Sequence, residues 1–177
     1  MSMTESIKLH EYKSPVGNLL LGDYLGKLVM SDWKYRKKRE EINARIADVL
    51  EVKFETELTP LHSTVIQQLD EYFQSKRTSF DLPLLFIGSE FQRSVWKALT
   101  EIPFGQTMSY LTLSRNLGDE KAIRAVASAN GANAISIIVP CHRIIGSDGS
   151  LTGYAGGLPA KKKLLMLEGS LSQMELF

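Results

Sequence analysis

The chain has 177 residues, of which 44% are hydrophobic and 23% are charged, with a net charge of +1 and a single cysteine. This length allows one large domain or two small ones, and one cysteine excludes both an internal disulfide framework and a zinc site built from several cysteines. Because the net charge is close to zero, any contact with nucleic acid must use few, well-placed cations.

The sequence offers no membrane or export signal. No apolar run approaches the length of a membrane span, and residues 1–6 lack the basic and apolar regions of a signal peptide. A reactive free thiol also suits a reducing compartment. We therefore expect a cytoplasmic protein that does not bind membranes.

The first half of the chain predicts a small antiparallel sheet with helices. Alternating apolar residues predict three strands joined by turns, over 7–12, 18–24 and 28–33. Apolar residues at helical spacing predict helices over about 38–50 and 61–73, and 52–57 is a candidate fourth strand. The polar, proline-marked segment 76–83 is the expected linker, so we place the end of the first domain at residue 82.

Two features of this half have a functional and a structural interpretation. The basic run 34–39 could contact nucleic acid, but a solvated helix start explains such a run more often. His10 and His62 have no clustered ligands near them in the sequence, so we interpret both as structural or exposed rather than metal-binding. This half therefore suggests no chemistry.

The second half is predicted to be mostly helical. A capping box at Ser89 precedes an apolar stripe that we assign to the core, formed by Phe91, Val95, Leu99 and Ile102. Two shorter helices follow, over 110–117 and 120–129, with a turn at Gly118 between them. Helix, glycine-containing turn and helix is the pattern of a helix-turn-helix.

The second helix of this pair carries one central cation and a face of small residues. Ile123 and Val126 are expected on its core side. The small residues are Ala122, Ala125, Ser128 and Ala129. They allow close approach either to a partner surface or to another helix, and their spacing does not separate the two. Arg124 is the cation, for which a weak surface salt bridge is the simpler interpretation.

The only cysteine follows the apolar run 135–139, which predicts a buried strand ended by Pro140. Cys141 and His142 would then lie just past the strand end. The thiolate is the attacking form of cysteine, and a neighbouring base raises its population, so the pair is a candidate nucleophile site. A buried, inert cysteine is the alternative, since adjacent side chains often point apart.

Three elements complete the chain. Residues 144–151 predict a hairpin, which after a helix-turn-helix resembles a winged helix. The glycine-rich segment 153–157 could present backbone amides to a ligand. Pro159 suits the start of a last helix, 161–167, and Gly169 its end.

Together these motifs resemble the O6-alkylguanine-DNA alkyltransferase (methylated-DNA–protein-cysteine methyltransferase) family. The matching pieces are 91–96, 103–110, 122–126, Asn133, 137–143, 153–157 and 164–169. The resemblance implies an α/β (α+β) fold in three parts. These are an antiparallel sheet-plus-helix domain of ribonuclease H type over 1–82, a mostly helical, winged-helix-like domain with the helix-turn-helix over 83–170, and a tail over 171–177.

The resemblance also implies direct-reversal DNA repair without a cofactor or metal. Cys141 would take an alkyl group from O6 of guanine, with O4 of thymine as a second candidate, once per molecule because a thioether is a poor leaving group. His142 would act as base through a water, oriented by Glu168. Asn133 would tie the helix-turn-helix to the active-site strand. Tyr110 would help rotate the nucleotide out and donate to guanine N3.

The implied partner is double-stranded DNA carrying O6-alkylguanine, bound through the minor groove by a monomer that is nucleoid-associated when on DNA. Arg124 would fill the stack that the flipped base leaves. The expected DNA contacts are Arg124, Tyr110, Ala122, Ala125, Ser128 and Ala129. The expected substrate pocket is Tyr154, Ala155, Gly156, Pro140 and Ile144.

Three residues depart from the family pattern. Ala134 follows Asn133 where proline is common, Ser136 stands where some relatives have proline, and Ala155 stands where some have serine.

Two alternative functions compete with repair. A non-catalytic lesion sensor would not need Cys141, and a Cys-His hydrolase would need an oxyanion hole and would have no use for a helix-turn-helix.

Overall fold

The structure is a computed structural model in which residues 5–171 are described. Residues 1–4 and 172–177 lie outside the described part, so the predicted tail over 171–177 is described only at its first residue. Within residues 5–171 no helix is long and apolar enough to cross a membrane.

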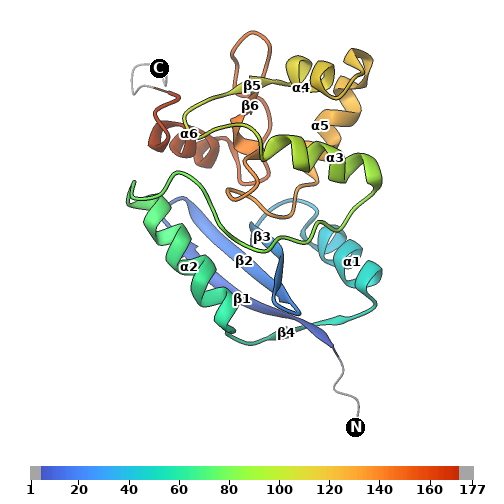
Figure 1. Ribbon diagram of the computed structural model, residues 1–177, viewed down its shortest axis with the longest axis vertical. Coiled ribbons are helices and arrows are strands. Elements are labelled where there is room, and N and C mark those ends of the chain that lie inside the picture. The colour runs from blue at the N-terminus through green and yellow to red at the C-terminus, as the bar shows by residue number, and fades with distance from the viewer. Residues whose placement is uncertain (1–4, 172–177) are drawn as a thin grey trace.

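The first half folds around a four-stranded sheet of order β3-β2-β1-β4 (Figure 1). The strands are β1 Ser6–Ser14, β2 Gly17–Tyr24, β3 Lys27–Trp33 and β4 Lys53–Thr56. The three predicted antiparallel strands are confirmed. The fourth pairs with β1 in parallel, which the sequence did not predict because four residues carry no information on strand direction.

Two predicted helices cover the two faces of this sheet (Figure 1). Helix α1 (Arg39–Leu50) buries Ile42 and Ile46 on one face, and α2 (Pro60–Phe73) buries Val65, Leu69 and Tyr72 on the other. His62 is fully buried, and its Nε2 lies 3.0 Å from the carbonyl of Lys8. Its expected structural role is therefore confirmed.

Strand β3 at the outer edge of the sheet is covered by segments that follow the first domain. Leu28 pairs with residues 83–85, its N–H donating to a carbonyl at 2.8 Å. The Ser31 N–H donates to the carbonyl of Ala134 at 2.8 Å, and the Ser31 carbonyl accepts from Ser136 at 2.7 Å. An edge strand otherwise leaves its backbone groups unpaired. Here these bonds join the two halves of the molecule.

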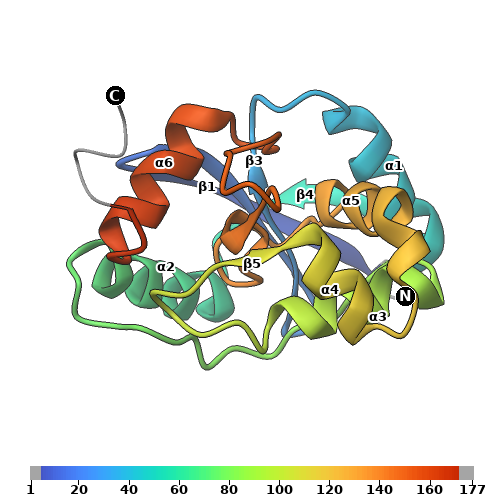
Figure 2. The same ribbon diagram turned by 90° about the horizontal axis from the view of Figure 1, so that it is seen from above.

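The second half is built from helices around a short parallel pair of strands. Figure 2 shows α6 on one side of this pair and α3, α4 and α5 on the other. The elements are α3 Glu90–Leu99, β5 Met108–Ser109, α4 Tyr110–Asn116, α5 Ile123–Gly131, β6 Ile144–Ile145 and α6 Leu158–Leu167. The capping box at Ser89 and the turn at Gly118 are confirmed.

Two predicted elements of this half are wrong. Residues 135–139 form a compact turn instead of a strand, with isolated bridges only and a left-handed Ile137 at φ 71°. A buried turn and a buried strand share the same apolar composition, so the sequence could not separate them. The hairpin over 144–151 is also absent, because β6 pairs in parallel with β5. Residues 146–150 form only its turn, closed by a 2.9 Å hydrogen bond.

Two residues expected in the core lie at the surface. Phe91 is 40% exposed and Ile123 is 36% exposed. Both stand in the first turn of their helices. The rest of the apolar stripe in α3, from Val95 onward, is buried as predicted.

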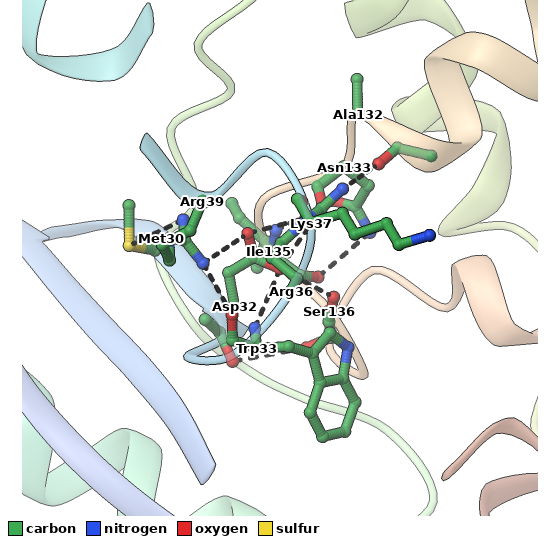
Figure 3. Close-up of polar contacts among 12 residues, drawn as sticks. Met30, Asp32, Trp33, Arg36, Lys37, Arg39, Ala132, Asn133, Ile135 and Ser136 are labelled. Atoms are coloured by element: carbon green, nitrogen blue, oxygen red, sulfur yellow. Dashed lines mark hydrogen bonds and ion pairs between the residues drawn. The ribbon is translucent and has the colours of Figure 1, made fainter. Parts of the chain in front are cut away.

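A buried carboxylate organises the basic run 34–39. Asp32 is fully buried and lies 3.2 Å from Arg36 Nη1 and 2.9 Å from Arg39 Nη1 (Figure 3). Arg36 also donates to the carbonyls of Gly131 at 2.7 Å and Asn133 at 3.4 Å. Two of the five cations in the run therefore hold the fold together and join its halves.

We predict that Asp32→Ala lowers the free energy of unfolding by about 3–5 kcal/mol, because it leaves two partly buried guanidinium groups without their carboxylate. Urea denaturation measures the loss. The matched control is Glu11→Ala, whose 2.9 Å pair with Lys34 is about one-third exposed on each side and should contribute little, because water screens exposed ion pairs. Equal losses for the two variants would contradict the role of Asp32.

Candidate functional site

Cys141 begins a short 3-10 turn, Cys141–Arg143, directly after Pro140. Its side chain is 2% exposed. Burial raises the pKa of the Cys141 thiol, and a hydrogen bond from Asn133 opposes this only in part. The thiol is therefore protonated at neutral pH, so its nucleophilic form requires a base.

Asn133 lies where it can fix the segment that leads to the cysteine. Its side-chain amide donates to the carbonyl of Val139 at 3.1 Å, and its amide oxygen accepts from the N–H of Ile135 at 2.9 Å. The residue follows α5 directly, so it joins the helix-turn-helix to residues 135–139. This placement agrees with the expected role, although the segment is a turn and not a strand.

His142 is fully buried beside Glu168, with Nε2 at 2.7 Å from the carboxylate Oε1. An ionised carboxylate only accepts hydrogen bonds, so Nε2 carries the proton and Nδ1 carries the lone pair. Among the residues described, Nδ1 has no hydrogen-bond partner. Burial lowers the pKa of His142, against the opposing effect of Glu168. The imidazole is therefore a neutral base at pH 7.

Glu168 lies at the end of α6 and binds three side chains at once. Arg143 Nε approaches Oε2 at 2.9 Å, and the Tyr72 hydroxyl donates to Oε1 at 2.8 Å, beside the His142 bond. Burial alone would raise the pKa of Glu168. The hydrogen bonds from His142 and Arg143 outweigh it and lower this pKa to about 2.

Two of these partners were not among the predicted site residues. Arg143 lies in the matching piece 137–143, but the resemblance implies no role for it. Tyr72 belongs to α2 in the first half and lies 96 positions from Glu168, so periodicity assigned it to the core and no local signal linked it to the site.

A third missed residue is Lys161, which is fully buried in α6. Its ammonium group donates to the carbonyls of Ile144 at 2.6 Å and Thr152 at 3.0 Å. Burial lowers its pKa to about 8. The side chain therefore fixes both ends of the segment 144–152, which precedes the glycine-rich segment. In the sequence it is the first of three consecutive lysines, and nothing there marks it as buried.

The expected DNA-contacting residues do not all lie at the surface. Arg124 and Ser128 are exposed on α5, and no ion pair within residues 5–171 involves Arg124, so the salt-bridge interpretation finds no partner there. Tyr110, the first residue of α4, is half-buried. Ala129 is 2% exposed and its carbonyl accepts from Trp96. Ala129 therefore packs into the core, which contradicts its expected place on a DNA-binding face.

A cleft of about 800 Å³ contains three of the expected pocket residues, Tyr154, Ala155 and Gly156. Ser128 of α5 and Trp33 of β3 also line it. The other two expected residues lie elsewhere: Pro140 lines a separate cleft of about 550 Å³, and Ile144 is fully buried. No group of three or more His, Cys, Asp or Glu side chains among residues 5–171 could hold a metal ion.

Glu168 should make stability depend on acid. Its folded pKa of about 2 lies below the ordinary 4.5, so its contribution is present above pH 4.5 and is lost as the pH falls toward 2. We predict that Glu168→Gln lowers the urea midpoint at pH 7. Between pH 4.5 and 2.5 the variant should lose less folding stability than the wild type does. Exposed Glu40→Gln, the control, should follow the wild type. A variant with the wild-type pH dependence would refute this assignment.

Two family models match successive parts of the chain. The model described as 6-O-methylguanine DNA methyltransferase, ribonuclease-like domain, matches residues 7–86. The model described as 6-O-methylguanine DNA methyltransferase, DNA binding domain, matches residues 90–170.

Similar proteins extend this match to nearly the whole chain. The methylated-DNA–protein-cysteine methyltransferase of Methanosarcina acetivorans is 45% identical over 160 residues, covering 90% of this chain and 96% of the relative. That of Mycobacterium tuberculosis H37Rv is 41% identical over 169 residues, covering 92% and 93%. A crystal structure of Mycobacterium tuberculosis OGT in complex with DNA superposes with a TM-score of 0.79 at 38% identity, covering 92% and 93%. The chain belongs to the 6-O-methylguanine DNA methyltransferase family.

Proposed function

We propose that this direct-reversal DNA-repair protein transfers an alkyl group from O6 of guanine to Cys141, once per molecule. The observation that carries the proposal is the buried series Cys141, His142 and Glu168. It combines a protonated thiol with a neutral imidazole whose Nε2 is fixed at 2.7 Å from a carboxylate. Nucleophile, base and orienting acid are the parts that covalent catalysis requires.

The proposed reaction balances without a cofactor. His142 Nδ1 takes the thiol proton through a water, and Glu168 stabilises the imidazolium that forms. The Cys141 sulfur then bonds to the alkyl carbon as the bond from that carbon to O6 breaks. Tyr110 donates to guanine N3, which stabilises the leaving base until it takes up the proton that His142 received from the thiol. The thioether is a poor leaving group, so each molecule reacts once.

DNA would bind along α5 in the minor groove. Exposed Arg124, Ala125 and Ser128 support this, because small side chains allow the helix to come close and one cation can enter the stack. The O6 atom is hidden in a duplex, so the base must be flipped, at a few kcal/mol. The minor groove distinguishes bases poorly, which suits repair at any sequence. A monomer in a reducing cytoplasm, beside the nucleoid, completes the proposal.

The buried thiol also fits a second candidate, a lesion sensor that binds alkylated DNA without chemistry. Cys141 is 2% exposed, and a buried thiol with a raised pKa is usually inert. The aligned His142 and Glu168 favour transfer, because a sensor has no use for an oriented base. Stoichiometric loss of O6-methylguanine from DNA separates the two candidates.

We predict that the wild type removes one methyl group per molecule from duplex DNA, with a linear titration that ends at equivalence. Arg124→Ala should slow this reaction by roughly tenfold or more, because the space left by the flipped base is then unfilled. Its reaction with free O6-benzylguanine should be unchanged, since no base is flipped. Exposed Lys27→Ala, at the start of β3, is the control. Equal losses on both substrates would remove the stacking role of Arg124.

A further inference from the structure

Trp33 belongs to the first half of the chain but lines the same cleft as Tyr154 and Gly156. It is the last residue of β3 and is 4% exposed. Its ring meets that of Tyr154 edge to face, with centroids 5.8 Å apart and planes at 71°. The two halves of the molecule therefore share one wall of the cleft, and the shared contact is aromatic.

Gly156 lies directly against the Trp33 ring. A Cβ at this glycine would stand 2.7 Å from Cδ2 and 2.8 Å from Nε1 of the indole, which is closer than side-chain atoms approach one another. Gly17 contacts another part of the same ring, where a Cβ would lie 3.1 Å from Cζ3. The backbone of the segment 154–157, here called the pocket loop, is therefore in contact with an indole that is itself confined.

Burial raises the pKa of the Tyr154 hydroxyl, and the nearby Trp33 N–H opposes this in part, although the two groups form no hydrogen bond of good geometry. Trp33 Nε1 and the Tyr154 hydroxyl are both buried without a hydrogen-bond partner among the described residues. A buried polar group without a hydrogen bond destabilises the fold, so the packing of the two rings must offset the loss. On its other side the Tyr154 ring lies 6.5 Å from the His142 ring, edge to face. Ring contacts therefore connect Trp33 of β3 to Tyr154 of the pocket loop, and Tyr154 to the imidazole of His142.

We propose that Trp33 is a positioning residue that fixes the pocket loop, and with it the backbone amides and the Tyr154 ring that face the flipped guanine. The inference rests on the proposed function. Because Trp33 acts through Tyr154 and Gly156, its loss should misplace the bound base relative to Cys141. Misplacement by about 1 Å can slow a reaction by about a hundredfold without changing how the macromolecule binds. The first domain then contributes to transfer and not only to folding.

The test measures the single-turnover rate constant for methyl transfer at saturating duplex DNA, beside the affinity for unmodified duplex. Trp33→Ala should slow transfer by roughly tenfold or more. Trp33→Phe should stay within about threefold of the wild type, because it keeps an aromatic ring packed against Tyr154 and Gly156. Affinity for duplex should be unchanged in both, since Trp33 is only 4% exposed and offers almost no surface to DNA.

Gly156→Ala supplies the complementary change, because its methyl group pushes against the indole. It should slow transfer, whereas Gly153→Ala, with no atom within 4 Å of its Cβ, should not. In the double variant Trp33→Ala/Gly156→Ala the effects should be less than multiplicative, since both disturb one contact.

Four results would overturn the proposal. These are an unchanged rate in folded Trp33→Ala, a parallel loss of duplex affinity, fully multiplicative effects in the double variant, and equal rates for Gly156→Ala and Gly153→Ala. The glycine pair decides the question even if Trp33→Ala does not fold. Absence of transfer by the wild type would instead refute the proposed function.

Discussion

The site depends on one buried carboxylate, that of Glu168. A charge removed from water is tolerated only when it is paired and its remaining acceptor sites are hydrogen-bonded. Glu168 meets this condition through His142, Arg143 and Tyr72. The same carboxylate therefore orients His142 and binds Arg143. Through Tyr72 it also connects the turn Cys141–Arg143 to α2.

The first half of the chain reaches the site from three directions. Tyr72 contacts Glu168, Arg36 bridges buried Asp32 to the carbonyls at the end of α5, and Trp33 packs against the pocket loop. Each contact is carried by a side chain on or next to the sheet. Breaking the packing between the halves would thus disturb His142, the turn before Cys141 and the cleft lined by Tyr154 together. The first half, which shows no chemistry of its own, therefore supports the candidate site.

Sequence reasoning succeeded where a local rule determines the structure. Periodicity and caps predicted β1 to β3, α1, α2 and α3 with small errors at their ends, and the adjacency of Cys141 and His142 pointed to the pair on which the proposed function rests. It failed where every residue of a segment is buried, and where a contact joins residues that are far apart in the sequence. The run 135–139 is apolar in a turn as in a strand, and Ala129 looks like Ala125 until the packing of α5 is known. Tyr72 and Trp33 lie far along the chain from their partners, so neither carried a signal of its site role.

The measurement that tests the central claim most directly is the intact mass of the protein after reaction with duplex DNA carrying one O6-methylguanine, followed by peptide mapping. We expect a gain of one methyl group, never more than one per molecule, located on Cys141 and absent from Cys141→Ser. Tight binding to the lesion without any gain in mass, or a methyl group on another residue, would contradict transfer to Cys141.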